Sequence, residues 1–333
     1  MEPLVEVRGL TKTFKRDDGT PVHAVRGIDL DIHKGEVFSL LGPNGAGKTT
    51  TISMISGLLE PSAGDARIGG HSIRQEPLEA KRLLGVVPQE IALYDELSAR
   101  QNLEFFGRMY GLSGAELNQR IDATLDFIDL ADRQNDAVKT FSGGMKRRVN
   151  IGVGLLHTPQ LVYMDEPTVG VDPQSRRRIL DTVLRLRDEY GMTVLYTTHL
   201  MEEAQELSDR VGIIDHGEII AMGTVGELVL QVGEQDRLVF NVGSAAVDDA
   251  LLGRLPNEVE GVTRAVYDPP GAGGENTDNE TGEIIVYANR GRRAMSPLIQ
   301  IINGAGLDIS SVAVREPDLE AVFLHLTGRA LRD

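Results

Sequence analysis

The sequence predicts an α/β protein with a mostly parallel sheet, followed by a smaller α+β domain. Short apolar runs alternate with amphipathic segments through the first two thirds of the 333 residues, which is typical of parallel sheets covered by helices. A glycine-rich segment lies between an apolar run and a helix at residues 42–50. From about residue 230 the order of strands and helices changes, so we expect domains at 1–230 and 231–333.

Composition excludes several classes of protein. A net charge of −16 argues against a general nucleic-acid or anionic-lipid binder. The basic clusters at 146–148 and 176–178 are expected on solvated or partner-facing helix surfaces. There is no apolar run of about 18 residues, so no membrane-spanning helix is predicted. The absence of cysteine excludes disulfides and thiolate metal sites and is compatible with a reducing cytoplasm.

The first strands lead into a phosphate-binding loop. Apolar spacing predicts strands at 4–8 and 24–32, and the run Glu36–Leu41 directly precedes the glycines. Because a helix follows, loop amides and a helix N-terminus converge on an anion. Lys48 would reach the β- and γ-phosphates of a nucleoside triphosphate, and the Thr49 hydroxyl would bind Mg²⁺. The predicted nucleotide-binding residues of the loop are Gly42, Pro43, Asn44, Gly45, Ala46, Gly47, Lys48, Thr49 and Thr50.

Helical periodicity dominates the next part of the chain. Residues 98 to about 131 and residues 142 to about 157 read as helices, which predicts a helical subdomain at about 90–158. A further helix is predicted at 176–190. The strands expected to complete the sheet cover residues 85–89, 160–166, 193–198 and 211–215.

Polar side chains stand at the ends of these strands. Asp165 follows four apolar residues, so it is expected at the carboxyl edge of the sheet, where it can hold Mg²⁺. Glu166 would face the γ-phosphate and orient or deprotonate the attacking water. His199 and Gln89 end neighbouring strands, and His199 could bind the γ-phosphate. Phe14 could stack on adenine or belong to the core.

Ser142, Gly143 and Gly144 open a helix and form a second candidate anion-binding site. They follow Lys48 by about 94 residues, and within one chain they have no evident phosphate to bind. In a head-to-tail pair of copies, they could close on the γ-phosphate held by the other copy. The sequence therefore favours a dimer as the functional unit.

The last hundred residues predict a β-α-β-β-α-β order, the ferredoxin-like pattern. From residue 217 onward there are 18 acidic residues and 9 arginines, a net charge of −9. A Pro/Gly-rich loop is expected at 269–282, and Asp318 is expected to cap a final amphipathic helix. The predicted strands are 237–242, 261–268, 283–288 and 307–314, and the helices are 245–255 and 293–303.

Residues 1 to about 230 resemble the ATP-binding subunit of ABC transporters, with the motifs of that family in order. Residues 42–50 match the Walker A loop, and 161–166 match the Walker B strand with its catalytic glutamate. Phe141 and Met145 depart from the commoner leucine and glutamine, as in the subfamily of antibiotic-resistance and other exporters, which the ending at 316–329 also resembles. The other matches are the Q-loop glutamine Gln89, the signature loop Ser142–Gly144, the D-loop ending at Asp172, the switch histidine His199 and the adenine-stacking position Phe14.

The resemblance implies a RecA-like P-loop NTPase with an N-terminal antiparallel β subdomain and a helical subdomain. It implies an ATPase that takes ATP and Mg²⁺ and works as a head-to-tail homodimer beneath separate membrane permease subunits, on the inner face of the membrane. Export of a drug-like, lipid or polysaccharide substrate is favoured. The implied catalytic residues are Glu166, His199, Lys48 and Gln89; the implied metal ligands are Thr49, Gln89 and Asp165; and Phe14, Ser142, Gly143, Gly144 and Asp172 are implied to contact nucleotide.

Three points stay open from the sequence. A soluble ABC-type ATPase in DNA repair or ribosome work is the alternative function, although the chain lacks the long insertions or tandem domains of such proteins. The C-terminal domain is expected to serve regulation, dimer contact or stability. The segment Tyr94–Tyr110, with Phe105, Phe106 and Tyr110, is the candidate surface for the permease.

Overall fold

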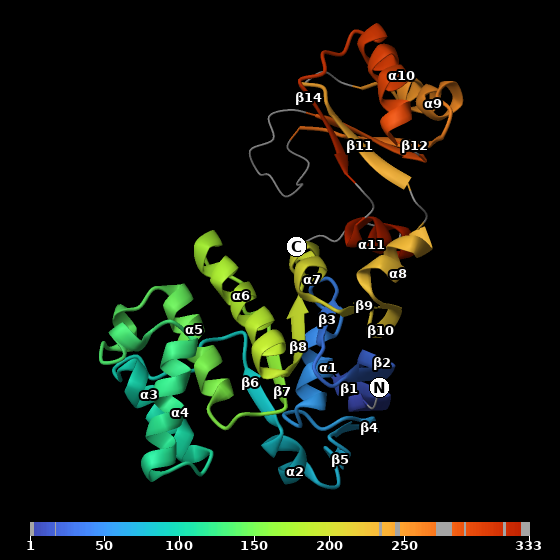
Figure 1. Ribbon diagram of the computed structural model, residues 1–333. Coiled ribbons are helices and arrows are strands. Elements are labelled where there is room, and N and C mark those ends of the chain that lie inside the picture. The colour runs from blue at the N-terminus through green and yellow to red at the C-terminus, as the bar shows by residue number, and fades with distance from the viewer. Residues whose placement is uncertain are drawn as a thin grey trace. The chain divides into compact units, whose positions relative to one another are not determined.

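In the computed structural model, the described residues are 3–16, 18–232, 235–243, 247–270, 282–289, 291–315 and 318–327. They fall into two compact units, Met1–Val225 and Gly226–Ala330 (Figure 1). The boundary expected near residue 230 falls inside helix α8 (Val225–Val232), and the assignment of independent domains stays a prediction. Among the described residues, no helix has the length and apolar character needed to cross a membrane.

The first unit is built on a mostly parallel sheet in the order β10-β9-β3-β8-β7-β6. All neighbouring strands in it are parallel except β10, which pairs antiparallel with β9. Since β3, β8 and β7 are neighbours with the same direction, the segments that follow them meet at one edge of the sheet. The strands are β3 (Val37–Leu41), β6 (Leu84–Val87), β7 (Leu161–Asp165), β8 (Thr193–Thr198), β9 (Arg210–Asp215) and β10 (Glu218–Gly223).

An antiparallel sheet in the order β2-β1-β4-β5 lies beside this core, as the resemblance implied. Its first strand is much longer than the predicted 4–8. The prediction ended early because register shifts on either side of Leu10 and the left-handed Gly9 (φ 55°) break the alternation of apolar residues. The strands are β1 (Pro3–Lys15), β2 (Pro21–His33), β4 (Ala63–Ile68) and β5 (His71–Ser72).

Helices pack on the sheets and form the helical region to one side (Figure 1). The helical stretch predicted from 98 to about 131 consists of two helices, α3 and α4, separated by a turn at the left-handed Gly111 (φ 85°). Ser98 caps α3 and exchanges hydrogen bonds with Gln101 in a capping box. The helices of this unit are α1 (Lys48–Ile55), α2 (Pro77–Arg82), α3 (Ala99–Met109), α4 (Gly114–Phe127), α5 (Gly143–Leu155), α6 (Pro173–Tyr190) and α7 (Met201–Leu207), with 3₁₀ turns at Ala131–Arg133 and Val138–Thr140.

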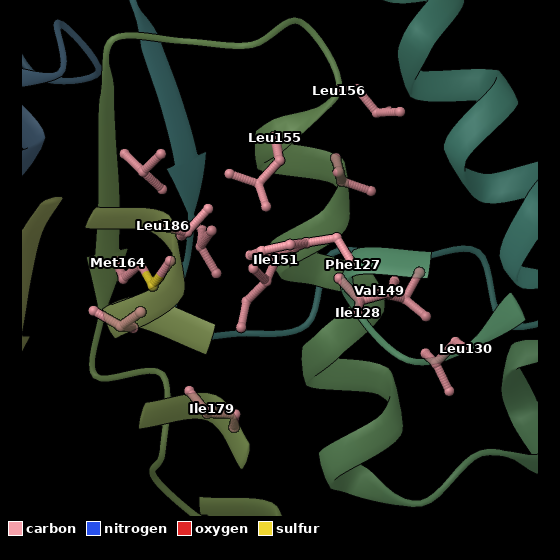
Figure 2. Packing of buried hydrophobic residues seen from close by; sticks show 14 of the residues in the cluster. Phe127, Ile128, Leu130, Val149, Ile151, Leu155, Leu156, Met164, Ile179 and Leu186 are labelled. Atoms are coloured by element: carbon pink, nitrogen blue, oxygen red, sulfur yellow. The ribbon is translucent and has the colours of Figure 1, made fainter. Parts of the chain in front are cut away.

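One continuous apolar cluster joins α3, α4, α5 and α6 to the parallel sheet. Figure 2 shows its centre, where Phe127 and Ile128 of the α4 end face Val149 and Ile151 of α5. Met164 of β7 belongs to the same cluster, so the cluster includes both α5 and the strand that ends in the carboxylates. Burial of this apolar surface is the main force that fixes the helical region against the sheet.

The second unit has the predicted ferredoxin-like fold. Its strands form an antiparallel sheet in the order β12-β13-β11-β14, and α9 and α10 pack on one face. Asp318 accepts a hydrogen bond from the Ala321 amide and caps the last helix, as predicted. The predicted loop at 269–282 lies mostly outside the described residues. The elements are β11 (Gln235–Asn241), α9 (Asp249–Glu258), β12 (Val262–Asp268), β13 (Glu283–Asn289), α10 (Gly291–Gly304), β14 (Ser311–Arg315) and α11 (Leu319–Thr327), after α8.

Candidate functional site

The glycine-rich loop leaves the buried strand β3 and enters α1 at Lys48. Two of its glycines are required by close contacts. A Cβ at Gly42 would lie 2.2 Å from the carbonyl oxygen of Ile214, and one at Gly47 would lie 2.6 Å from that of Ala24. Gly47 also has a φ of 107°, which side chains strongly disfavour. The loop therefore holds its curved shape only with glycine at these positions.

A pocket of about 190 Å³ opens against this loop. Its wall is formed by the glycine-rich loop with the start of α1, by Ala24 of β2, and by Gln89 and Glu166, which follow β6 and β7. The lining residues are Ala24, Pro43, Asn44, Gly45, Gly47, Lys48, Thr49, Thr50, Gln89 and Glu166. Backbone amides, a buried ammonium, a hydroxyl and a carboxylate in one concave wall suit a triphosphate with a divalent cation.

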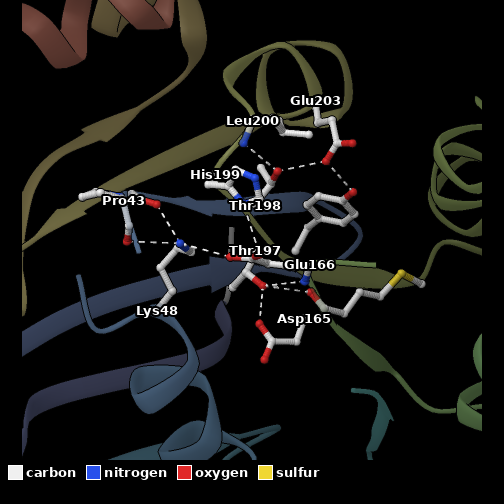
Figure 3. Close-up of polar contacts among 12 residues, drawn as sticks. Pro43, Lys48, Asp165, Glu166, Thr197, Thr198, His199, Leu200 and Glu203 are labelled. Carbon is white, nitrogen blue, oxygen red and sulfur yellow. Dashed lines mark hydrogen bonds and ion pairs between the residues drawn. The ribbon is translucent and has the colours of Figure 1, made fainter. Parts of the chain in front are cut away.

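Lys48 is the buried cation of the pocket, with 4% of its surface exposed. Its Nζ donates hydrogen bonds to the carbonyl oxygens of Gly42 at 2.7 Å and Pro43 at 3.3 Å. It also lies 3.1 Å from Glu166 Oε1 (Figure 3). A buried charge needs such partners, so the lysine is held at the centre of the phosphate loop rather than in solvent.

Asp165 is the last residue of β7 and Glu166 follows it, but their side chains have different environments. The Thr197 hydroxyl of the neighbouring strand β8 donates to Asp165 Oδ1 at 2.7 Å and accepts from the Glu166 amide at 3.0 Å. Glu166 has a left-handed φ of 41°, an uncommon conformation for a residue with a side chain. This turn directs its carboxylate towards Lys48 and the pocket. The Thr197 contact could not be predicted from the sequence, because it depends on the register of two strands.

His199 follows β8, and its Nδ1 lies 3.0 Å from Glu166 Oε2 (Figure 3). The hydrogen bond with His199 and the charge of Lys48 lower the pKa of the Glu166 carboxyl, although burial opposes them. Glu166 is therefore ionised near neutral pH and can accept a proton. Lys48, Glu166 and His199 form one hydrogen-bonded cluster, from three segments distant in the sequence.

The signature loop lies elsewhere. Ser142 caps α5 and accepts a hydrogen bond from the Met145 amide at 3.3 Å, as expected for a helix start. Ser142 and Gly143 are exposed, while a Cβ on Gly144 would lie 2.2 Å from Ser175 Oγ of α6. Of the described residues, those that line the phosphate pocket do not include 142–144. The arrangement thus leaves the signature loop on a surface, apart from the chain's own pocket.

The remaining predicted residues lie around the site. Asp172 is exposed and caps α6 through the Ser175 amide at 2.9 Å. Hydrogen bonding from the Ser175 side chain, and then from its amide, lowers the pKa of the Asp172 carboxyl. Phe14 is 41% exposed on β1, with the Lys12 ammonium 5.3 Å from its ring centre. It is therefore a surface aromatic rather than part of the core. Gln89 is exposed and lines the pocket.

The expectation that the basic cluster 146–148 lies on a solvated or partner-facing helix surface is wrong for two of its residues, Arg147 and Arg148. Arg147 is 4% exposed, and its guanidinium donates to the carbonyl oxygens of Pro88 at 2.9 Å and Gln89 at 2.6 Å. Arg148 is also buried, at 6% exposed, and donates to the Ile128 carbonyl at 2.8 Å. The prediction from helical spacing was wrong here because α5 is buried on almost every side from Arg147 onward, so no face of it is left for solvent. In the second cluster, Arg177 is exposed as expected.

Comparisons with known proteins agree with this geometry. A profile of the ABC transporter family matches residues 25–169. The linearmycin resistance ATP-binding protein LnrL of Bacillus subtilis (strain 168) is 45% identical over 93% of this chain and 95% of its own length. The daunorubicin/doxorubicin resistance ATP-binding protein DrrA of Streptomyces peucetius is 37% identical, covering 99% and 94%. The Nod factor export ATP-binding protein I of Cupriavidus pinatubonensis is also 37% identical, covering 99% and 93%.

A solved structure also resembles this chain. It is the dimeric post-hydrolysis state of the ATP-binding cassette MJ0796 bound to ADP and Pi, with a TM-score of 0.61 and 28% sequence identity. It covers 66% of this chain and 98% of its own.

Proposed function

This chain belongs to the family of ABC transporter ATP-binding proteins and is an ATPase, and from this we propose that two copies bind two Mg²⁺-ATP between them. We propose further that this dimer drives an export permease. The observation that carries the proposal is the cluster of Lys48, Glu166 and His199 beside the phosphate pocket, with the signature loop exposed elsewhere. One chain has half of each site, and a head-to-tail partner would supply the other half.

In this proposal the chain's residues divide the work of hydrolysis. Lys48 and the loop amides hold the β- and γ-phosphates and stabilise the charge that develops during transfer. Thr49, Asp165 and Gln89 would hold Mg²⁺, which neutralises phosphate charge when bound. Glu166 accepts the proton of the attacking water, and His199 orients that carboxylate.

Nucleotide recognition would involve both copies. Phe14 stacks on adenine in its own chain, since its ring is exposed. Ser142, Gly143 and Gly144 meet the γ-phosphate bound by the other copy, and Asp172 lies at the contact between the two. Closure then depends on ATP, so hydrolysis reopens the pair.

We further infer that the permease binds around the aromatic cluster after Gln89. Tyr94 and Phe105 are 49% and 38% exposed, and their ring centres are 4.8 Å apart in an edge-to-face contact. Phe106 extends the cluster, 5.3 Å from Phe105. Such a patch fits an apolar segment of a membrane protein. Through it the ATPase would sit on the inner face of the membrane.

The names of the relatives favour export, and we infer a drug-like, lipid or polysaccharide substrate. Phe105→Glu tests the permease site: membrane-bound protein should fall while ATP binding persists. Retention at the parental level in membranes that contain the permease would contradict it.

The catalytic assignment is tested by Glu166→Gln. Hydrolysis of ATP should be nearly abolished, while equilibrium binding of a fluorescent ATP analogue remains close to that of the parent. Hydrolysis at the parental rate would overturn the role of Glu166. Ser142→Arg should block ATP-dependent dimerisation measured by sedimentation, yet leave binding to the monomer intact; unchanged dimerisation would overturn the shared site.

A further inference from the structure

Glu203 is a buried carboxylate of α7 that the proposed chemistry does not use. Only 1% of its surface is exposed, and both of its oxygens accept hydrogen bonds. Arg176 Nε donates to Oε1 at 2.8 Å, while the hydroxyls of Tyr196 and Thr198 donate to Oε2, both at 2.9 Å. Burial and the nearby Glu203 raise the pKa of the Tyr196 hydroxyl, so that hydroxyl stays protonated as a donor. The carboxylate on α7 therefore accepts hydrogen bonds from two other elements, α6 and β8.

One of these hydrogen bonds reaches the turn that carries His199. The Thr198 hydroxyl donates to Glu203 and also accepts from the Leu200 amide at 2.9 Å, so it joins the residues on both sides of the histidine (Figure 3). His199 Nδ1 in turn lies 3.0 Å from Glu166 Oε2. A shift of this turn would alter the distance between the histidine and the glutamate directly.

The other oxygen of Glu203 connects to α6. Arg176 lies in the first turn of that helix, and its amide donates to the Asp172 carbonyl at 2.8 Å. Its side chain is 31% exposed, so the ion pair joins a buried anion to a cation near the surface. Removal of one partner from such a pair leaves the buried charge uncompensated. The pair thus ties the start of α6 to α7, and the Thr198 hydrogen bond extends the connection to the end of β8.

We propose that Glu203 is a positioning residue that holds His199 against Glu166 and couples that contact to the start of α6. The inference rests on the proposed function, in which Glu166 activates water. The proposed role of Glu203 provides a route between Asp172, at the proposed contact between copies, and Glu166. A movement of Asp172 would change the position of His199 relative to the Glu166 carboxylate. The route is Asp172, Arg176, Glu203, Thr198 and His199, each in contact with the next or adjacent to it in the chain.

The test compares Glu203→Gln with Glu202→Gln in the full chain. Glu202 is the exposed neighbour on the same helix, so its variant controls for the loss of one negative charge. We expect Glu203→Gln to lower kcat for ATP hydrolysis by about tenfold to a hundredfold while KM stays within about twofold, because misplacement of a catalytic group acts on the chemical step. The imidazole ¹⁵N resonances of His199 should shift as well. Glu202→Gln should leave both kcat and those resonances unchanged.

A second pair of variants keeps the test decisive if Glu203→Gln does not fold. Thr198→Val removes the hydroxyl that joins Glu203 to the His199 turn, whereas Tyr196→Phe removes a hydrogen bond to the same carboxylate oxygen without involving that turn. We expect Thr198→Val to reduce kcat by about tenfold and Tyr196→Phe by less than about twofold. Equal losses of kcat, or an unshifted His199 spectrum in Thr198→Val, would overturn the proposal.

Glu166→Gln separates this inference from the function on which it rests. If that variant still hydrolyses ATP, the catalytic assignment fails first. If it does not, while Glu203→Gln or Thr198→Val hydrolyses ATP at the parental rate, only the positioning role of Glu203 is wrong.

Discussion

Arg147 offers a direct test of how α5 supports the site. Arg147→Met keeps the apolar stem and removes both hydrogen bonds to the carbonyl oxygens of Pro88 and Gln89. At about 1.5 kcal/mol for each hydrogen bond to a charged group, the loss is about 3 kcal/mol. In the parent protein, burial of the guanidinium opposes its charged form and lowers the Arg147 pKa, so it cancels part of the stabilisation from the two hydrogen bonds. We therefore expect the free energy of unfolding to fall by about 2 kcal/mol.

Urea denaturation followed by circular dichroism gives that free energy, and hydrogen exchange reports the loop itself. Amides at 88–92 should exchange faster in Arg147→Met, and kcat for ATP hydrolysis should fall by about tenfold because Gln89 is less well held. Arg177→Met is the matched control. Its side chain is 56% exposed and pairs with Asp181 and Glu206, so its removal should cost less than about 0.5 kcal/mol. Equal losses in the two variants, or unchanged exchange at 88–92, would refute the reasoning.

Three further predictions concern packing and pH. Gly144→Ala places a methyl group 2.2 Å from Ser175 Oγ and should cost about 2 kcal/mol in urea denaturation, which Ser175→Gly in the same chain partly restores; no rescue would contradict the contact. Burial lowers the His157 pKa, so stability falls as the pH drops from about 6.5; Tm of His157→Phe should vary less than that of the parent between about pH 7 and pH 5. The lowered pKa of Glu166 gives stability that is present above about pH 4.3 and is lost as the pH falls through the lowered value. Glu166→Gln should therefore lose less stability than the parent below about pH 4, and parallel acid titrations would contradict this.

Local sequence was sufficient for those parts of the site that short segments determine. The phosphate loop needs a strand, glycines and a helix start within a few residues, and all of these are contiguous. The start of α5 at Ser142 and the cap of the last helix at Asp318 follow from single residues at helix ends in the same way. The α/β class and the ferredoxin-like order came from the alternation of elements, which depends on apolar spacing alone.

The contacts that orient the proposed catalytic groups could not be predicted in this manner. Thr197 reaches Asp165 because β7 and β8 pair in one register, and a shift by one residue would turn the threonine to the other face. Arg147 was misplaced for a related reason: a helix covered on nearly all sides has no amphipathic pattern to mark its buried face. In both cases the missing information is which segments become neighbours.

The buried Arg147 has a consequence for communication between the proposed half-sites. Helix α5 begins at Ser142, which would meet nucleotide on the other copy, and one turn later it holds the backbone of Gln89 in the chain's own pocket. Because neighbouring turns of a helix are held together by backbone hydrogen bonds, a displacement of Ser142 on the proposed closure would move Arg147, and with it the backbone of Gln89. The apolar cluster that connects α5 to β7 resists any independent movement of the helix. In the proposed dimer, binding at one pocket and contact with the other copy would therefore be linked through α5 alone, independently of the route through Asp172 and Glu203.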